Sequence, residues 1–257
     1  MKDSSPGIEA SGDLVFVGDV HLDGTDAHLE AFLDFLEGLR ETTSRLVFLG
    51  DLFNLWIGRR ELEQPHQRAV AEKLESLRGG GMVVRYVEGN RDYRIGPAYV
   101  GSALDEATLD GISEEFGGRR LWAIHGDLAN PTDRYYRRWR AVSRSAPFWV
   151  LFNLIPRKRR MRLADSIESK MRKSNREFKA GFPEPEVRTY AAGFLQQGYD
   201  TVVLGHFHVE KDLRAQVRET TGRILVLPEW RESRRHLRVD RGGNVEFVDS
   251  TPSGSRG

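Results

Sequence analysis

The chain has 257 residues, enough for one large domain or two small ones. Apolar residues make up 39% and charged residues 30%, which is typical of a globular protein and excludes a disordered chain. There is no cysteine, so structural disulfides, thiolate catalysis and thiolate metal sites are excluded.

Both ends of the chain are predicted to lack regular structure. Residues 1–12, rich in Ser, Gly and Pro, are predicted to form a disordered leader, and residues 251–257 a flexible tail. The start lacks the basic residues and apolar core of a signal peptide. The longest apolar stretch, 148–155, is far shorter than the ~20 residues of a membrane-spanning helix. We therefore expect a cytoplasmic protein.

Short β-branched or aromatic runs recur after the leader, each four to six residues long and suited to a buried strand. They cover residues 14–17, 46–49, 82–87, 121–124, 201–204, 224–227 and 245–248. Helical patterns separate the earlier runs, at 27–40 with Asp26 as predicted N-cap, at 64–77 and at 184–197. This alternation predicts a layered α/β fold, in which the late strands form hairpins.

Residues 133–180 break this alternation. They contain no strand-like run and look helical, with interruptions at Pro147 and Pro156. We predict an inserted helical lid here, and a core formed by residues 13–132 and 181–250. From Asp133 to Lys179 there are fifteen Lys and Arg against four Asp and Glu, a local net charge of +11 in a chain whose net charge is +1. Such a segment favours an anionic partner, although a solvated helix face explains the charge equally well.

Five loops each place a metal-ligand type of side chain directly behind an apolar run. They are Gly18-Asp19-Val20-His21, Gly50-Asp51, Gly89-Asn90-Arg91-Asp92, His125-Gly126-Asp127 and Gly205-His206-Phe207-His208. A single Asp after a strand is usually a turn residue or a helix cap. Five such loops, holding four of the seven histidines, make that explanation improbable.

These side chains define a class of metal. Carboxylate, imidazole and amide ligands without thiolate suit Mn²⁺, Fe²⁺ or Zn²⁺. Two ions that share a carboxylate can activate water near neutral pH and neutralise the charge of a phosphoryl group. The five loops therefore favour the hydrolysis of phosphate esters.

In their order and combination, the five motifs resemble the calcineurin-like metallophosphoesterases, and they extend from residue 18 to residue 208. The resemblance implies a β-sandwich of mixed sheets flanked by helices, and two divalent metal ions, with manganese as the working metal. It also implies the metal ligands. One ion would be held by Asp19, His21 and His208, the other by Asn90, His125 and His206, and Asp51 would bridge them.

The third motif points to a narrower group. Many relatives have His after the Asn of this motif, whereas this chain has Arg91. A guanidinium cannot act as a general acid near neutral pH, but it can bind a phosphoryl group through two hydrogen bonds. The run from Gly89 to Tyr93 with Gly96, and Gly50-Asp51-Leu52-Phe53 with Trp56 and Gly58, resemble the UDP-2,3-diacylglucosamine pyrophosphohydrolases of the lipid A pathway.

That resemblance implies the reaction and its residues. The products would be UMP and 2,3-diacylglucosamine 1-phosphate. Asn90, Arg91 and His206 would stabilise the phosphoryl group, and the residues that position the sugar phosphate would be Asp133, Tyr136, Asn175 and Lys179. Asp92 and Asp127 are expected to orient metal ligands rather than to bind metal.

Some positions depart from the narrower group. Arg59 and Arg60 stand where acidic residues are usual, and Met171 and Phe178 replace the usual Ser and Lys of the insertion. The metal motifs are unaffected, but these changes leave open a phosphodiesterase or pyrophosphatase for another nucleotide conjugate. A third hypothesis, a non-catalytic membrane-binding scaffold, would be marked by a lost metal ligand, and none is missing from the sequence.

The lid carries an apolar run at 148–155 followed by an unbroken basic run at 157–160. This pattern predicts peripheral contact of residues 146–162 with the inner face of the cytoplasmic membrane, or a groove for acyl chains. Ordinary core packing of the apolar residues is the alternative. Arginines between the lid aromatics also resemble a nucleic-acid surface, but so dense an apolar block disfavours it, and no nucleic-acid partner is expected.

Three further positions have simpler interpretations. His28 and His66 lie in helical patterns and are predicted to be surface residues. Glu229-Trp230, just after the 224–227 strand, is predicted to form a structural corner.

Overall fold

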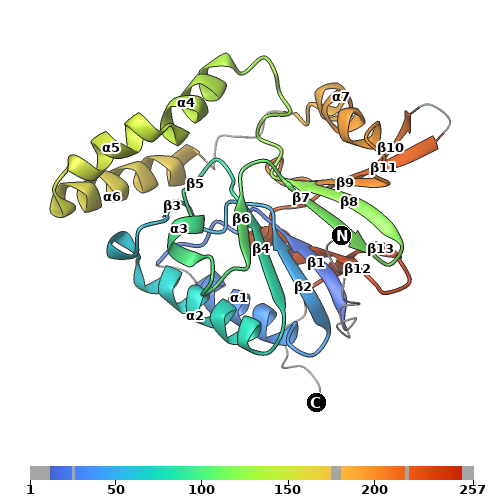
Figure 1. The fold of residues 1–257 in the computed structure, drawn as a ribbon, viewed down its shortest axis with the longest axis horizontal. Helices are drawn as coiled ribbons and strands as arrows, with labels where there is room; N and C mark the ends of the chain where they lie inside the picture. The colour runs from blue at the N-terminus through green and yellow to red at the C-terminus, as the bar shows by residue number, and fades with distance from the viewer. Residues whose placement is uncertain (1–11, 25–26, 175–180, 218–219, 251–257) are drawn as a thin grey trace, which may run out of the picture.

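The structure is a computed structural model that describes residues 12–24, 27–174, 181–217 and 220–250. Two β-sheets lie face to face, helices α1 and α2 cover the outer face of one, and helix α7 covers the outer face of the other (Figure 1). The predicted α/β class, with a sandwich of sheets flanked by helices, is confirmed. The predicted leader and tail fall outside the described residues, apart from Gly12, and so does the predicted cap Asp26.

The first sheet has six strands in the order β13-β12-β1-β2-β4-β6. Four of them run parallel to one another: β1 (Asp13–Val17), β2 (Thr43–Phe48), β4 (Val83–Val87) and β6 (Glu106–Thr108). The other two, β12 (Arg235–Val239) and β13 (Val245–Asp249), are antiparallel and form the expected late hairpin at one edge.

The second sheet has five strands in the order β10-β11-β9-β8-β7. Its centre is parallel and consists of β8 (Arg119–Ile124), β9 (Thr201–Leu204) and β11 (Thr220–Val226). Antiparallel strands complete it at both edges, namely β7 (Ile112–Phe116) and β10 (Lys211–Val217). Strand β7 was not predicted from the sequence, because Ser113, Glu114 and Glu115 separate its apolar residues and leave no apolar run.

Alternating side chains explain why the central strands read as continuous apolar runs. Leu14 and Phe16 of β1 point into the layer between the sheets, where they pack with Val203 of β9. Val15 and Val17 point the opposite way, toward α1 (Ala27–Gly38) and α2 (Pro65–Gly79). Helix α7 (Glu184–Leu195) covers the second sheet in the same manner. Since both faces of each central strand are covered, no polar alternation is needed.

Short elements fill the connections. The segment between β2 and α2 contains β3 (Trp56–Ile57), which pairs with β5 (Asp92–Tyr93), and a 3₁₀ helix, η1 (Arg60–Leu62). Helix α3 (Gly96–Tyr99) follows β5, and α8 (Trp230–Ser233) follows β11. The prediction that His66 is a surface residue is wrong: its ring is only 4% exposed and packs edge-on against Phe53, because the N-terminal turn of α2 faces the core.

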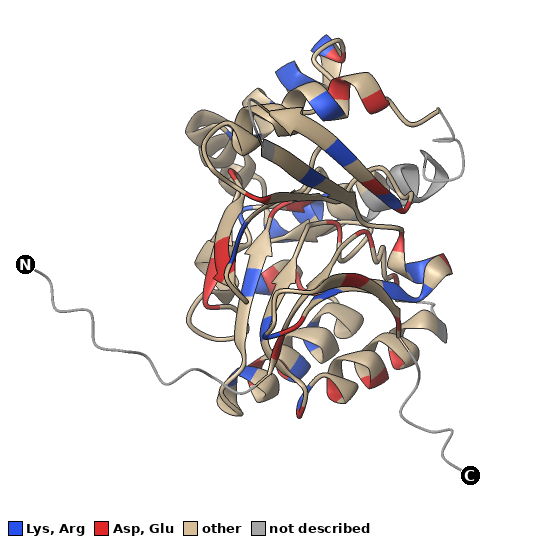
Figure 2. Cartoon of the chain, turned by 90° about the vertical axis from the view of Figure 1, so that its right-hand side faces the viewer, with Lys and Arg blue, Asp and Glu red and all other residues tan. Residues whose placement is uncertain are grey.

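Residues 134–174 form three helices between β8 and α7: α4 (Arg134–Arg144), α5 (Ala146–Leu154) and α6 (Arg157–Ser174). They project from one side of the sandwich (Figure 1). Charges of both signs are interspersed on the face of the molecule opposite to them (Figure 2). Within the described part of the chain, no helix combines the length and the apolar character needed to cross a bilayer.

Helix α5 has two different faces. Trp149 and Phe152 are buried and pack on Leu55 and Tyr93 of the core, as the core-packing interpretation expected. The opposite face is exposed: Val150 by 61%, Leu151 by 66% and Leu154 by 75%. Only half of the apolar run is therefore used in folding.

Candidate metal centre

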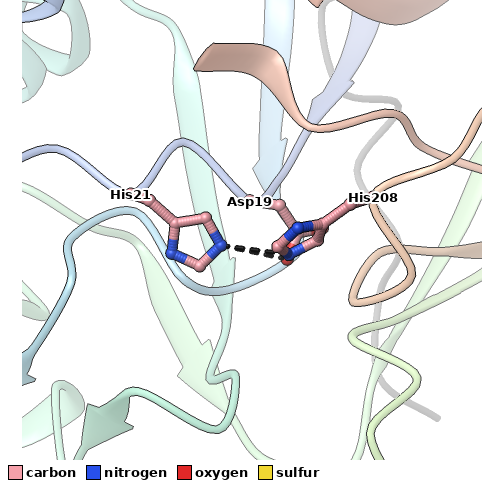
Figure 3. A group of neighbouring side chains, drawn as sticks. All are labelled: Asp19, His21 and His208. Atoms are coloured by element: carbon pink, nitrogen blue, oxygen red, sulfur yellow. Dashed lines mark hydrogen bonds and ion pairs between the residues drawn. The ribbon is translucent and has the colours of Figure 1, made fainter. Parts of the chain in front are cut away.

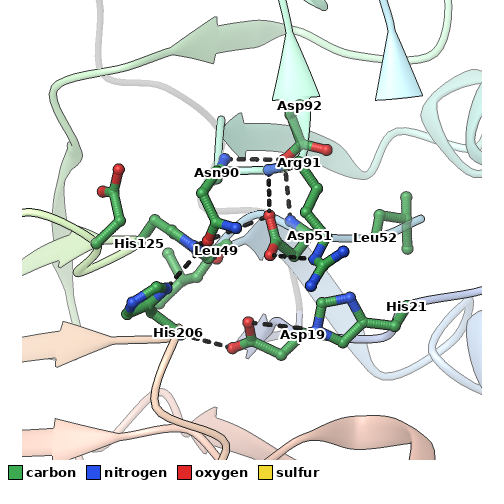
Figure 4. A network of polar contacts seen from close by, with 12 residues as sticks. Asp19, His21, Leu49, Asp51, Leu52, Asn90, Arg91, Asp92, His125 and His206 are labelled. Atoms are coloured by element: carbon green, nitrogen blue, oxygen red, sulfur yellow. Dashed lines mark hydrogen bonds and ion pairs between the residues drawn. The ribbon is translucent and has the colours of Figure 1, made fainter. Parts of the chain in front are cut away.

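The five motif loops meet at one edge of the sandwich. Three follow parallel strands of the first sheet, β1, β2 and β4, and two follow β8 and β9 of the second. The carboxyl ends of these strands lie at the same edge, so side chains from residues 19 to 208 converge although they are far apart in sequence (Figure 4). The predicted ligands that the structure brings together are Asp19, His21, Asp51, Asn90, His125, His206 and His208.

Asp19, His21 and His208 form one group (Figure 3). Nε2 of His21 and Nε2 of His208 lie 3.1 Å apart. Oδ1 of Asp19 is 3.4 Å from Nε2 of His208 and 4.0 Å from Nε2 of His21. This buried carboxylate oxygen accepts no hydrogen bond within the described residues. This oxygen and the two imidazole nitrogens that face it are suitable ligands for a divalent cation.

A second group centres on Asn90. Its Oδ1 lies 3.0 Å from both Nε2 of His125 and Nδ1 of His206. The carbonyl oxygen of Leu49 lies 2.6 Å from Nδ1 of His125 and can only accept, so this nitrogen carries a proton. In the neutral ring, Nε2 then offers a lone pair toward another acceptor, Oδ1 of Asn90. A second proton or a metal ion satisfies both atoms, and this donor set also fits a divalent cation.

Asp51 lies between the two groups. Its Oδ1 accepts a hydrogen bond from the backbone of Arg91 at 3.0 Å and lies 3.9 Å from Nε2 of His125. Its Oδ2 lies 3.5 Å from Nε of Arg91. Asp51, Asp19 and His125 could hold an ion together, so Asp19 takes part in both carboxylate–imidazole groups. Asp51 is the residue for which the family resemblance implies a bridging role.

The backbone of these loops is strained where the ligands sit. Asp19, His21, Asp51, His206 and His208 all have positive φ, between 52° and 71°. Only two other non-glycine residues in the described ranges share this conformation, Arg94 and Arg234. A left-handed conformation costs of order 1–3 kcal/mol for such residues and persists where the surrounding structure imposes it. Its concentration at these five positions marks a site held for function rather than for stability.

Glycines allow the loops to approach closely. A Cβ on Gly89 would lie 2.3 Å from Oδ1 of Asp51, and one on Gly50 would lie 2.7 Å from Nδ1 of His125. Gly50 also has a φ of +81°, which other residues rarely adopt. The glycines at the start of these motifs therefore make room for the carboxylate and imidazole beside them.

Burial and neighbouring charges set the protonation of the ligands. Burial, reinforced by neighbouring imidazoles, lowers the pKa of His21 far below its ordinary value and that of His206 to about 4. Both rings are therefore neutral at pH 7 and can offer lone pairs. Burial opposes ionisation of Asp19 too, but the adjacent imidazole of His208 holds the pKa of Asp19 below its usual value. The same pairing outweighs burial at His208 and raises its pKa to about 9.

Asp92 supports the ligand loops from behind. Its Oδ2 accepts hydrogen bonds from the backbone of Asp51 at 2.9 Å, the backbone of Gly89 at 2.8 Å and the hydroxyl of Tyr86 at 2.8 Å. Burial, and then the charge of Asp51, raise the pKa of Asp92 to about 7. This carboxyl group ties the second and third motif loops together.

Asp127 connects the fourth motif loop to helix α4. Its Oδ2 accepts hydrogen bonds from the hydroxyl of Tyr136 and, at 2.8 Å, from Nε of Arg140, both on α4. Asp133 caps the same helix by accepting the backbone N–H of Tyr136 at 2.8 Å. Two other residues predicted to bind substrate, Asn175 and Lys179, lie outside the described residues.

Glu229, predicted to form part of a structural corner, lies beside a metal ligand in the structure. Its Oε2 lies 3.5 Å from Nδ1 of His208. No role was predicted for Glu88, which directly precedes the third motif and forms an ion pair with Arg144 of α4. A signal for Glu229 was present, because it follows an apolar strand as the five motifs do. Glu88 carried the same signal, since it directly follows β4.

The site and fold together define a metal-binding phosphoesterase. The chain matches the calcineurin-like phosphoesterase family over residues 13–210 and belongs to that family. It is a hydrolytic enzyme that binds divalent metal.

Relatives with curated names are similar over most of their length. The UDP-2,3-diacylglucosamine hydrolase of Stenotrophomonas maltophilia strain K279a is 32% identical over 240 residues, 89% of this chain and 95% of the relative. The protein of the same name from Xanthomonas campestris pv. campestris strain ATCC 33913 is 31% identical over 89% of this chain and 96% of its own. An archaeal phosphodiesterase of known structure is 11% identical, with a TM-score of 0.48 over 92% of this chain and 98% of that one.

Proposed function

We propose that this enzyme cleaves the pyrophosphate bond of UDP-2,3-diacylglucosamine in lipid A biosynthesis, releasing UMP and 2,3-diacylglucosamine 1-phosphate. The observation that carries the proposal is the convergence of seven ligand-type side chains at the carboxyl ends of five strands, with Arg91 among them. The relatives named UDP-2,3-diacylglucosamine hydrolase support the choice of substrate, since the similarity covers 89% of this chain.

Two ions would occupy the site. Asp19, His21 and His208 would hold one, Asn90, His125 and His206 the other, and Asp51 would lie between them. Mn²⁺ is proposed as the working metal, with Fe²⁺ or Zn²⁺ as alternatives. Bound there, the pair would activate water near neutral pH and neutralise charge on the phosphoryl oxygens.

Arg91 suits a pyrophosphate better than an alkyl phosphodiester. Its side chain is 8% exposed and its Nε lies 3.5 Å from Oδ2 of Asp51, so the guanidinium is held beside the proposed metals. It can bind phosphoryl oxygens through two hydrogen bonds but cannot donate its proton to a leaving group. A phosphate leaving group is a weak base and needs no proton from the protein, whereas an alkoxide does. The guanidinium would thus stabilise the charge that develops on the phosphoryl group.

Asn90 and His206 would complete the phosphoryl contact. The carboxamide oxygen of Asn90 is directed at two imidazoles, which leaves its N–H groups to donate to a phosphoryl oxygen. His206 is fixed through its backbone N–H, which donates to Oδ2 of Asp19 at 2.7 Å. Both side chains are therefore oriented before substrate arrives, which is the condition for efficient stabilisation of a transition state.

The lid would bind the remainder of the substrate. Asp133 and Tyr136, at the start of α4, lie next to the fourth motif loop and would position the sugar phosphate, together with Asn175 and Lys179. The exposed apolar face of α5 would contact acyl chains. The same face, followed by the basic residues 157–160, would place residues 146–162 against anionic headgroups at the inner face of the cytoplasmic membrane.

The direct test is a product assay. The protein with Mn²⁺ is incubated separately with UDP-2,3-diacylglucosamine and with an unacylated UDP-sugar, and UMP is quantified. We expect UMP from the diacylated substrate at a much higher kcat/KM than from the unacylated one. Equal rates on both substrates would replace the proposal by the second candidate, a pyrophosphatase for other nucleotide conjugates.

The second candidate rests on altered residues near the lid. Arg59, which stands where the narrower group is usually acidic, donates a hydrogen bond from Nη2 to Oδ1 of Asn153 on α5 at 2.8 Å. Arg60 donates to the carbonyl of Ala98 at 3.1 Å and to Oγ of Ser102 at 2.9 Å. Acidic side chains at these two positions could not donate these hydrogen bonds. The contacts lie in the region that would recognise the acylated sugar.

A further inference from the structure

A sixth loop reaches the metal centre from beyond the matched family region, which ends at residue 210. It follows β11, which lies parallel to β9 in the second sheet. The backbone N–H of Leu227 donates to the carbonyl of Leu204 at 2.7 Å, so the two strands stay in register up to the point where the fifth motif begins. The residues after Leu227 therefore emerge beside His206 and His208.

Glu229 in this loop faces the outer side of His208. Its Oε2 lies 3.5 Å from Nδ1 of the ring, while Nε2 of the ring points to Asp19 and His21. When an ion takes the place of the proton on Nε2, a carboxylate on the Nδ1 side would keep the remaining ring proton there and leave the Nε2 lone pair for the ion. Glu229 occupies the N-cap position of α8 but makes no side-chain capping hydrogen bond. Its carboxylate is thus directed to the imidazole rather than to the helix.

Arg231 holds the first motif from the same turn. Its Nη1 donates to the backbone carbonyl of His21 at 2.9 Å and lies 3.9 Å from Oδ2 of Asp23. His21 has a left-handed backbone, with φ of 52°, whose energetic cost must be offset by surrounding contacts. Arg231 supplies one of these, and the backbone N–H of His21, which donates to the carbonyl of Asp51 at 3.0 Å, supplies another.

Trp230, between these two residues, anchors the turn. It is 1% exposed and packs edge-on against Phe32 of α1, with 4.9 Å between ring centroids, and against Phe35 at 5.4 Å. Its indole N–H donates to Oγ of Ser250 at 3.1 Å. A fully packed aromatic residue with its polar atom satisfied fixes its neighbours in place. Glu229 and Arg231 are therefore presented to the ligands by a rigid support.

We infer that the turn 229–231 is a sixth component of the metal centre, in which Glu229 positions the imidazole of His208 and Arg231 positions the backbone of His21. The inference rests on the metal centre of the proposed function but not on its substrate. Both contacts act on the Asp19–His21–His208 group, and none of those described for this turn touches the Asn90 group. Removing these contacts is expected to weaken binding of the ion held by the Asp19–His21–His208 group and to leave binding of the other ion unchanged.

The test is Mn²⁺ binding, measured by titrating the metal-free full-length protein and following the electron paramagnetic resonance signal of the free ion. Glu229→Leu, which keeps the size of the side chain, is expected to weaken one of the two sites by about 10- to 100-fold. Glu229→Gln keeps an acceptor oxygen and should lie between Leu and wild type. Arg231→Met should weaken the same site. The control is Glu232→Gln, an exposed residue in the same short helix.

Thermal unfolding of the metal-free variants separates positioning from folding. Metal-free Glu229→Leu is expected to have the same melting temperature as the metal-free wild type, because Trp230 still anchors the turn. Added Mn²⁺ should raise the melting temperature of the variant less than that of the wild type. Wild-type affinity at both sites in Glu229→Leu would overturn the inference, and so would a loss of metal-free stability that accounts for the weaker binding. Absence of UMP release by the wild type would contradict the proposed substrate alone, since metal affinity is measured without substrate.

Discussion

Arg144, at the end of α4, forms a buried ion pair with Glu88, the residue that directly precedes the third metal motif. Nη2 of Arg144 also donates to the carbonyl of Gly89 at 2.6 Å. Glu88 in turn accepts the backbone N–H groups of Arg94 at 3.1 Å and Ile95 at 2.6 Å. The C-terminal end of α4 is thus attached to the loop that carries Asn90, in addition to the contact between Asp127 and the start of α4.

Breaking this pair should destabilise the protein. Arg144→Met leaves the Glu88 carboxylate buried without its cation, and we expect a loss of about 3–5 kcal/mol in the free energy of unfolding. Adding Glu88→Gln removes the unpaired charge. The double variant should therefore lose less free energy of unfolding than the sum of the losses in the two single variants. Urea unfolding of the four proteins measures this coupling. Arg138→Met, at an exposed position of α4, is the control, and additive losses would show that the pair is not coupled.

Much of the fold could be predicted from the sequence, because the central strands are buried on both faces. Runs such as 14–17 and 201–204 therefore show as uninterrupted apolar segments. The edge strand β7 could not be found in this way, because Ser113, Glu114 and Glu115 interrupt its apolar residues. Glu114 is buried and pairs with Arg45 of β2 and Arg85 of β4 in the facing sheet, which is a tertiary relationship.

The ligand loops were visible in the sequence because each places a rare residue type behind a strand. The supporting residues outside the motifs also follow strands, but the sequence did not indicate which residues they contact. Glu88 and Glu229 are ordinary acidic residues in sequence, and only the register of β4 and β11 with their neighbours brings them to Arg144 and His208. The two faces of α5 were equally hidden, because its apolar run has no polar side to mark which residues face the core.

Asp51→Ala should abolish metal-dependent hydrolysis. The carboxylate lies between the two ligand groups and also accepts the backbone N–H of Arg91, so its loss disturbs both groups and the loop between them. Asp51→Asn keeps the acceptor for Arg91 but not the charge, and it should be nearly as inactive. Turnover with Mn²⁺ and metal content measured by atomic emission test this, with the exposed Asp34→Asn as control. Full turnover in Asp51→Ala would refute the two-metal assignment.

Arg91→Ala should lower kcat by a factor of ~10²–10³ with little change in metal content, because a single donor to the developing charge is removed. Arg91→Lys should recover part of the rate, since it restores charge without the two-pronged geometry. The matched control is Arg94→Ala on the same loop, whose exposed guanidinium lies over the ring of Trp149 rather than toward the ligands. An undiminished rate in Arg91→Ala would place the phosphoryl contact elsewhere.

The two faces of α5 should respond differently to substitution. Replacing Val150, Leu151 and Leu154 together with Ser should change stability by no more than about 0.5 kcal/mol each, because these side chains are exposed. The same variant should bind phosphatidylglycerol liposomes at least ~10-fold more weakly and have a raised KM for the diacylated substrate. Hydrolysis of a small phosphodiester should be unaffected.

The buried face provides the comparison. Trp149→Ala should cost about 3–5 kcal/mol of stability, since the ring is 3% exposed and packs with Tyr93 and Phe152. Circular dichroism melts distinguish this from the outer variant. Unchanged liposome binding and KM in the outer variant would remove the acyl and membrane roles of this face together.

His236 should make the protein less stable as the pH falls below neutral. Its ring is buried in β12 against Phe35, with Nδ1 3.0 Å from Oγ of Ser250, and burial followed by the charge of Arg238 lowers its pKa to about 4. The unfolded chain has the ordinary value of about 6.5 and takes up a proton first. The stabilising contribution of the neutral ring is therefore complete above pH 6.5 and is lost progressively as the pH falls toward 4.

Between pH 7 and pH 5 this contribution amounts to about 2 kcal/mol for a single site with those two pKa values. His236→Gln keeps a polar group near Ser250 but cannot titrate, so its free energy of unfolding should fall by about 2 kcal/mol less than that of the wild type over this interval. Urea unfolding of the metal-free proteins at both pH values gives the comparison and avoids the pH dependence of metal binding. Only the change with pH is compared, so the cost of the substitution itself does not enter. Equal changes in the two proteins would show that the ring takes up a proton as readily in the folded protein as in the unfolded chain.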